Sequence, residues 1–372
     1  MVQFRFGHAA GSGWREAADA CLARMGAPEV SGNLGFLYVT DSLAAELAPI
    51  LRYLRSRTSV EDWVGAVGMG ICATGTEYYD EPAIAAMVGH FPEGSFRVFQ
   101  PIEEDLRPFE AAHGEWVRAH RPHLALAHAE PRGGAVANVL EQFADRLEGG
   151  FLVGGLASSR GAYGLVAGTV AEGGVSGVLF APDVAVRTRL SQGCSPIGPR
   201  RDITEAERNV VIRLDGRRAL DILREDIGEV LSRDLGRIGG YIFAGLPIEG
   251  SDTGDYLVRN LVGLDTEDGL VAIGDWAQPG GQLMFCRRDG QTAREDLVRM
   301  LEALGRGLAR PPRGGVYVSC VGRGVNLFGP DSAELGLIRD VLGEFPLVGF
   351  YANGEISHRR LYGYTGVLTL FL

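Results

Sequence analysis

Hydrophobic and polar positions near the C-terminus follow a strand–helix–strand pattern. Three short apolar runs there are typical of buried strands, and a turn at Asn353-Gly354-Glu355 separates the second run from the third. Between the first two runs, apolar residues recur at helical spacing after Asp331, which forms a capping-box pattern with Glu334. The expected strands are 316–321, 347–351 and 364–372.

The same unit of strand, helix, strand, glycine turn and strand occurs twice more along the chain. The three copies start at residues 34, 124 and 316, so the starts are 90 and 192 residues apart. A unit that recurs in this way indicates a repeat architecture. The expected strands of the two earlier copies are 34–39, 64–69, 83–88, 124–129, 151–153 and 175–180.

A stretch rich in serine, glycine and proline, 191–201, is the most linker-like part of the chain. We place the domain boundary there, which divides the chain into 1–195 and 196–372. Beyond the boundary, apolar runs between 241 and 286 are typical of an antiparallel set of strands. The sequence therefore predicts an α/β fold with two domains, in which mixed β-sheets are flanked by helices and built from the repeated unit.

Composition and charge exclude several classes of function. The net charge of −11 argues against nucleic acid or an anionic membrane surface as the main partner. The chain contains no lysine, which excludes a Walker A phosphate loop and a pyridoxal Schiff base. We expect no signal peptide and no membrane insertion, since no apolar run approaches the length of a membrane span. Five scattered cysteines favour a reducing, cytoplasmic location over a disulfide framework.

Two patterns look like cofactor sites but favour structural explanations. Residues 68–73 match the G-x-G-x-x-A dinucleotide fingerprint, yet the residues that follow form a poor helix, so a glycine turn between two strands is favoured. Four histidines lie close together in sequence, but they lack the fixed spacing of metal ligands. We interpret them as solvated loop residues, with a haem or metal ligand as the alternative; they are His113, His120, His123 and His128.

Cys320 lies at the end of a predicted strand and is followed by Gly322-Arg323-Gly324. An arginine beside a strand-end cysteine lowers the thiol pKa and makes a nucleophile, for which His358 is the candidate base. The alternative is a buried cysteine that acts as a small apolar residue. The sequence leaves both hypotheses open.

Arg323 and Glu355 both lie at strand ends of the C-terminal unit, where ligands bind in open α/β sheets. If they converge there, the arginine suits the carboxylate of a zwitterionic ligand and the glutamate suits its ammonium group. The alternative is a structural salt bridge that closes the turn.

With these residues identified, the chain resembles the FIST family, the paired N- and C-terminal sensory domains of signal transduction proteins. Similarity to the C-terminal domain is carried by SCVGRG at 319–324, PLVGFYANGEI at 346–356 and the closing TGVLTLFL. Similarity to the N-terminal domain is carried by AVGMGICATG, VGGLASS and SQGCSPIG.

The resemblance implies a non-catalytic sensor that binds a small ligand such as an amino acid and signals to a separate partner protein. It implies no obligatory cofactor, although some family members are described as haem-dependent nitric oxide sensors, and this is the main alternative. A thiol-dependent enzyme that uses Cys320 is the second alternative. From the residues, we expect the ligand to contact Arg323, Glu355, Asn353, Cys320, Ser158 and Thr74.

Overall fold

The computed structural model describes residues 4–27, 32–147, 149–248 and 256–372. The chain forms two compact units, Met1–Ser191 with Arg294–Leu372, and Gln192–Ala293. It leaves the first unit at the start of the stretch that the sequence predicts as a linker. It returns to the first unit at Arg294, so the compact units differ from a division into 1–195 and 196–372.

The first unit contains three copies of one structural repeat, here called repeats 1, 2 and 3. Repeat 1 consists of β1 (Arg5–Ala10), α1 (Trp14–Met25), β2 (Leu34–Thr40), η1 (Asp41–Glu46), α2 (Leu47–Thr58), β3 (Asp62–Gly68), β4 (Gly70–Ala73), β5 (Thr76–Tyr79) and β6 (Ala83–Gly89). Repeat 2 consists of β7 (Phe96–Ile102), α3 (Arg107–His120), β8 (Leu124–Ala129), α4 (Val136–Arg146), β9 (Phe151–Leu156), β10 (Leu165–Ala167), β11 (Thr169–Ala171) and β12 (Val175–Phe180). Repeat 3 consists of β13 (Val186–Gln192), α6 (Gly290–Gly305), β22 (Gly314–Cys320), α7 (Val325–Phe328), α8 (Ala333–Leu342), β23 (Leu347–Ala352), β24 (Glu355–His358), β25 (Arg360–Tyr362) and β26 (Thr365–Phe371).

The three repeats pair their strands in the same way. Each has two parallel central strands, and its last strand lies antiparallel to the first of that pair. The sheet orders are β1-β6-β2-β3-β10-β11, β7-β12-β8-β9-β24-β25 and β13-β26-β22-β23-β4-β5. The mixed sheets and the repeating unit that the sequence predicts are thereby confirmed.

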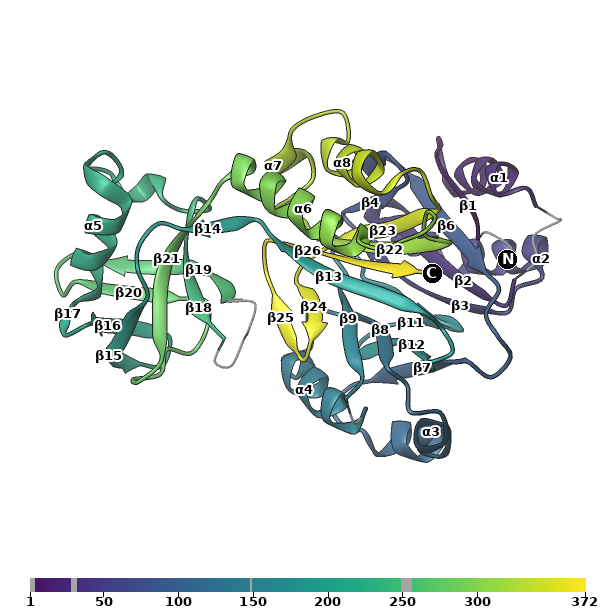
Figure 1. The fold of residues 1–372 in the computed structure, drawn as a ribbon, viewed down its shortest axis with the longest axis horizontal. Coiled ribbons are helices and arrows are strands. Elements are labelled where there is room, and N and C mark those ends of the chain that lie inside the picture. The colour runs from purple at the N-terminus through teal and green to yellow at the C-terminus, as the bar shows by residue number, and fades with distance from the viewer. Residues whose placement is uncertain (1–3, 28–31, 148, 249–255) are drawn as a thin grey trace. The chain divides into compact units, whose positions relative to one another are not determined.

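A hairpin exchanged between repeats completes each sheet. The hairpin β4–β5 of repeat 1 extends the sheet of repeat 3, β24–β25 of repeat 3 extends the sheet of repeat 2, and β10–β11 of repeat 2 extends the sheet of repeat 1. Figure 1 shows β4 beside β23 and β24 beside β9. The G-x-G-x-x-A stretch lies mostly in β4 and opens a hairpin, which confirms the predicted glycine turn between strands.

One glycine recurs at the same place in the second parallel strand of each repeat. A Cβ atom at these positions would lie 1.7–1.8 Å from a carbonyl oxygen of the neighbouring strand, so only glycine fits there. The three glycines are Gly65, Gly154 and Gly349, and the carbonyl oxygens belong to Leu37, Ala127 and Tyr317.

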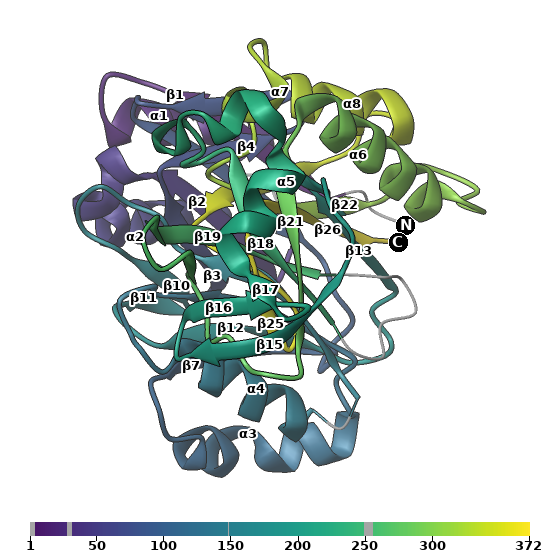
Figure 2. The same ribbon diagram turned by 90° about the vertical axis from the view of Figure 1, so that its left-hand side faces the viewer.

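The inner faces of the three sheets share one hydrophobic core. Residues from the central strands of all three repeats belong to it, among them Phe36, Val64, Leu126, Val153, Val318 and Phe350. Helices cover the outer faces: α1 and α2 pack on the first sheet, and α3 and α4 pack on the second. Figures 1 and 2 show α3 and α4 together on one side of the second sheet.

The second unit, Gln192–Ala293, is inserted into repeat 3 and runs from the last residue of β13 into the first turn of α6. Starts of the repeats are 90 residues apart (34 to 124) and 192 apart (124 to 316), and the excess of 102 residues is the length of this insertion. Its elements are β14 (Cys194–Pro196), β15 (Arg201–Glu207), β16 (Val210–Leu214), β17 (Arg217–Arg218), α5 (Ala219–Ser232), η2 (Leu235–Arg237), β18 (Ile242–Pro247), β19 (Tyr256–Asp265), β20 (Leu270–Ile273) and β21 (Gln282–Arg288).

The strands of the insertion close on themselves. The order runs from β21 through β15, β16, β20 and β19 to β18, which pairs back with β21. The hydrophobic core inside includes Leu220 and Leu223 of α5 together with Val211, Val271 and Phe285 of the strands. The expected antiparallel strand set is therefore confirmed. Within the described parts of both units, no helix is long and apolar enough to cross a membrane.

Candidate functional site

Buried and half-buried ionisable side chains gather at the carboxyl ends of β22 and β23, the parallel pair of repeat 3. Ligands of open α/β sheets bind beyond this end of the strands, because helix and loop starts meet there. We call this group the strand-end cluster, and its members are Glu77, Tyr79, Tyr317, Arg323, Glu334 and Tyr351.

The centre of the cluster is an ion pair between Arg323 and Glu334. Both side chains are fully buried, and the guanidinium lies 2.8 Å from the carboxylate. Glu334 also accepts hydrogen bonds from the Tyr317 hydroxyl at 2.6 Å and from the backbone N–H of Gly324 at 2.9 Å. Burial lowers the pKa of Arg323, but the adjacent Glu334 raises it, and the net direction is upward. The arginine is therefore charged, and its other N–H groups contact the Ser191 carbonyl and hydroxyl and the Tyr317 hydroxyl, each at 3.4 Å.

The predicted capping box at the start of α8 is wrong. The helix begins at Ala333 after Ser332, and no side chain caps it. Glu334 turns inward to Arg323, because an unpaired buried guanidinium costs far more than an open helix end.

The exchanged hairpin of repeat 1 brings Glu77 and Tyr79 to this site. The ring of Tyr79 lies against that of Tyr351, with 4.9 Å between centroids. Glu77 Oε1 and both tyrosine hydroxyls are buried, and none of the three makes a hydrogen bond within the described residues. Burial, and then the nearby charge of Glu334, raise the pKa of Glu77 to about 7.

Gly324 holds the β22–α7 turn against these tyrosines. Its φ is +51°, a conformation that favours glycine. A Cβ atom there would lie 2.1 Å from the Tyr79 hydroxyl oxygen and 2.8 Å from the Tyr351 ring. The close approach of the turn therefore needs the glycine.

Glu355 does not pair with Arg323, which pairs with Glu334 instead, so the alternative of a structural salt bridge between Arg323 and Glu355 is wrong. Glu355 is fully buried in β24 and accepts hydrogen bonds from the Thr365 backbone at 3.1 Å and the Thr365 hydroxyl at 2.8 Å. Its Oε1 atom has no hydrogen-bond partner among the described groups. Burial raises the pKa of Glu355 to about 8, more than Thr365 and Arg323 lower it.

The sequence hypothesis of a reactive Cys320 is also contradicted. The residue is only 7% exposed, and burial and the charge of Glu355 raise the pKa of its thiol, whereas Arg323 lowers it only slightly. The buried, apolar interpretation of this cysteine is the one that the geometry supports. His358, the candidate base, is exposed and stacks on Phe151.

Ser158 and Thr74 join different repeats through hydrogen bonds. The Ser158 hydroxyl of repeat 2 accepts from the backbone of Met69 in repeat 1 at 2.8 Å and donates to the Tyr351 carbonyl of repeat 3. Thr74 donates to the Phe345 carbonyl at 2.7 Å and accepts from the Leu347 backbone at 3.0 Å. Asn353 is exposed at the turn after β23, and its backbone donates to the Leu156 carbonyl.

The four neighbouring histidines have separate environments. His128 is fully buried and bonds the Tyr38 hydroxyl at 3.0 Å, and burial lowers its pKa to about 3. His120 stacks on Trp116, His123 donates to the Val184 carbonyl, and His113 packs on Phe109. In the ranges that the structure covers, no three histidine, cysteine or acidic residues are arranged to hold a metal ion.

Sequence reasoning missed Glu77, Tyr79 and Tyr351 as site residues. Glu77 and Tyr79 lie about 240 residues before the turn they contact, and only the hairpin exchange brings them there. A signal was present: the hairpin carries the acidic and aromatic sequence TEYY directly after a glycine turn.

Comparison with known proteins gives family matches over most of the chain. A FIST N domain matches residues 33–217, and a FIST C domain matches residues 219–358. An uncharacterized protein of Mycobacterium tuberculosis is 32% identical over 379 residues, which cover 93% of this chain and 92% of that protein. An uncharacterized protein of Mycobacterium bovis is 27% identical over 363 residues, which cover 93% of this chain and 91% of that protein.

These matches define a class of sensory proteins that act in signal transduction. The chain belongs to the FIST family, as its sequence motifs predict. A sensory role follows from this membership.

Proposed function

We propose that this protein is a non-catalytic, cytoplasmic sensor that binds a small metabolite with an amino group, such as an amino acid. In this proposal the ligand binds at the strand-end cluster, and the signal passes to a separate protein. One observation carries the proposal: Glu77 Oε1 and the hydroxyls of Tyr79 and Tyr351 are buried together without hydrogen-bond partners in the described chain.

Buried polar groups without partners are costly, at about 1–3 kcal/mol each. A single ammonium group has three donors, so it satisfies a carboxylate and two hydroxyls at once. Its positive charge also stabilises Glu77 as a carboxylate, because a nearby cation favours the charged form of an acid. An amino compound is therefore the ligand class that fits these three groups best.

Of the zwitterion hypothesis, we retain the contact between a glutamate and the ammonium group of the ligand, but we assign it to a different glutamate. Arg323, the expected carboxylate ligand, is already paired with Glu334 inside the protein. Glu77 takes the role that the sequence analysis assigns to Glu355, which lies fully buried against Thr365.

A non-catalytic role agrees with the state of the candidate reactive groups. The Cys320 thiol has a raised pKa, and the Arg323 guanidinium is fully paired. The Cys320 thiol therefore lacks the exposed, activated environment that nucleophilic catalysis needs.

Thermal unfolding in the presence of amino acids tests the proposal. A ligand that binds only the folded state raises the melting temperature. At a concentration of one hundred times Kd it adds about 2.7 kcal/mol to the free energy of unfolding. We expect at least one amino acid to stabilise the protein, and its analogue without the amino group to have no effect.

Glu77→Gln should abolish this stabilisation, because it removes the charge that holds the ammonium group. Glu81→Gln is the matched control, since Glu81 is exposed just beyond the same hairpin. If no amino acid shifts the melting temperature at millimolar concentration, or if Glu77→Gln retains the shift, the proposal is wrong.

A further inference from the structure

A second cavity lies at the opposite, amino-terminal edge of the sheet of repeat 2. It has a volume of about 490 Å³ and lies between the C-terminal ends of α3 and α4, where the chain enters β8 and β9. This volume is within the usual range for small-molecule sites. Because it lies at the amino-terminal edge of another sheet, the cavity is distinct from the strand-end cluster at the carboxyl ends of β22 and β23.

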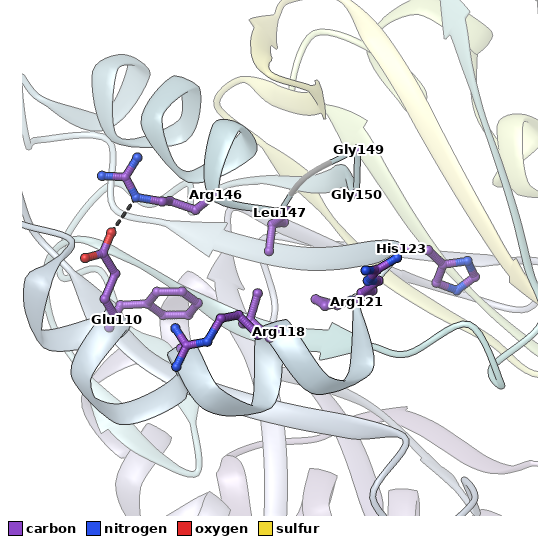
Figure 3. A pocket seen from close by; sticks show the side chains of 12 residues that line it. Glu110, Arg118, Arg121, His123, Arg146, Leu147, Gly149 and Gly150 are labelled. Atoms are coloured by element: carbon purple, nitrogen blue, oxygen red, sulfur yellow. Dashed lines mark hydrogen bonds and ion pairs between the residues drawn. The ribbon is translucent and has the colours of Figure 1, made fainter.

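Three arginines line this cavity (Figure 3). Arg146 from the end of α4 forms an ion pair with Glu110 of α3. Arg118 and Arg121, from the last turn and the cap of α3, have no acidic partner within the described chain. The cavity thus concentrates positive charge in a protein whose net charge is −11.

Backbone geometry fixes the position of Arg121. The residue has a left-handed φ of +44°, and its N–H donates to the Val117 carbonyl at 2.8 Å, which ends the helix. In Figure 3, Arg118 extends toward the side of Glu110, whereas Arg121 lies on the side of His123. The two guanidiniums therefore flank the cavity from different sides.

The walls between these charges are partly apolar. Phe109 and Val117 of α3 and Leu147 after α4 line the cavity. Apolar walls with a few charged groups are typical of sites for small organic molecules. They favour an anion that carries a hydrophobic body over a bare inorganic ion.

Repeat 3 contains an equivalent cavity that serves as an internal comparison. It has a volume of about 480 Å³, lies beyond the end of α6, and is also lined by three arginines and one glutamate. Two of its arginines are already engaged: Arg187 donates to the carbonyls of Leu304 and Arg306, and Arg313 donates to the His90 carbonyl. In repeat 2, Arg118 and Arg121 make no such contact with described groups.

We propose that the cavity between α3 and α4 binds a small organic oxyanion, a carboxylate or phosphate monoester on an apolar body, through Arg118 and Arg121. Guanidinium groups match both oxyanions through paired hydrogen bonds. The apolar body rests on Phe109, Val117 and Leu147.

Isothermal titration calorimetry at low ionic strength tests the site with two probes, phenyl phosphate and phenylacetate. We expect at least one probe to bind, with an affinity that falls as salt is added. The probe that binds more than tenfold tighter identifies the anion class. Benzyl alcohol, which has the same ring without the charge, should not bind.

Arg118→Gln and Arg121→Gln should each weaken the tighter probe by tenfold or more, as expected for loss of a charge-assisted hydrogen bond. Arg310→Gln, an exposed arginine of the equivalent cavity in repeat 3, should leave the affinity unchanged. Glu77→Gln should also have no effect, which separates this site from the amino-acid site. The proposal fails if neither probe binds, if benzyl alcohol binds equally, or if the Arg118→Gln/Arg121→Gln variant binds as the parent does.

Discussion

At the scale of residues, the chemistry of this protein depends on which partner each buried ionisable side chain contacts. Arg323 pairs with Glu334, and Glu355 accepts hydrogen bonds from Thr365, although spacing in the sequence suggests an Arg323–Glu355 pair. The result is one ionised pair and one carboxyl group that keeps its proton near neutral pH. Each arrangement has its own measurable consequence.

Arg323→Ala should lower the free energy of unfolding by about 3–5 kcal/mol, because it leaves Glu334 buried without its counter-charge. Urea denaturation measures the change. Arg339→Ala is the control: Arg339 is an exposed arginine of α8 paired with Asp340, so its removal should cost less than about 1 kcal/mol. A loss as small as the control's would contradict the structural role of the Arg323–Glu334 pair.

Glu355→Gln should flatten the pH dependence of stability between pH 6.5 and 8. The folded protein holds the Glu355 proton up to a pKa of about 8, whereas the unfolded chain releases it near the ordinary value of 4.5. Its stabilising contribution is therefore complete below pH 4.5 and is lost as pH rises to 8, by up to about 1.4 kcal/mol per unit. The buried histidines act below this window, because burial lowers the pKa of His128 to about 3.

Urea denaturation at several pH values compares this variant with the parent protein. Part of the slope should remain in Glu355→Gln, because the pKa of Glu77 is also raised, to about 7. Glu81→Gln should keep the full slope of the parent. An unchanged slope in Glu355→Gln would show that Glu355 is ionised in the folded protein.

At the scale of elements, the exchanged hairpins decide what the strand ends can do. Hairpin β4–β5 adds Glu77 and Tyr79 to the third sheet, and β24 carries Glu355 to the second. Ser158 then joins all three repeats with a single hydroxyl group. A local motif near one strand end is therefore completed by a hairpin from elsewhere in the chain.

At the scale of the whole molecule, the threefold repeat and its insertion explain the spacing of the motifs. Between the first strand and first helix, repeats 1 and 2 need only residues 11–13 and 103–106, whereas repeat 3 has residues 193–289 at this point, which are most of the second unit. The insertion closes its own strands around its own hydrophobic core. Folding of the first unit accordingly depends on contacts within the three repeats.

Replacement of Gln192–Ala293 by a short glycine–serine loop should therefore leave a first unit that folds cooperatively. Circular dichroism and a single, sharp thermal transition check this prediction. A matched variant with Arg323→Ala in the shortened chain should again lose about 3–5 kcal/mol. An unfolded or molten product would show that the first unit needs the insertion for its stability.

The sequence by itself determines the repeating unit and the strands. Apolar runs of strand length, helical periods and glycine turns are local signals, and so the three units and the turn at Gly68–Gly70 are predictable from them. The family motifs are local too, which explains why the sensory class is predictable.

Only the tertiary structure decides which side chains contact one another at the site. Whether Glu334 caps α8 or pairs with Arg323 depends on burial, which no spacing rule reports. Glu77 reaches Tyr351 through a hairpin exchanged across the fold, and Cys320 has a raised thiol pKa because surrounding strands exclude water. Pairing and desolvation arise from long-range packing, so the chemistry of the site follows from the fold and not from neighbours in the chain.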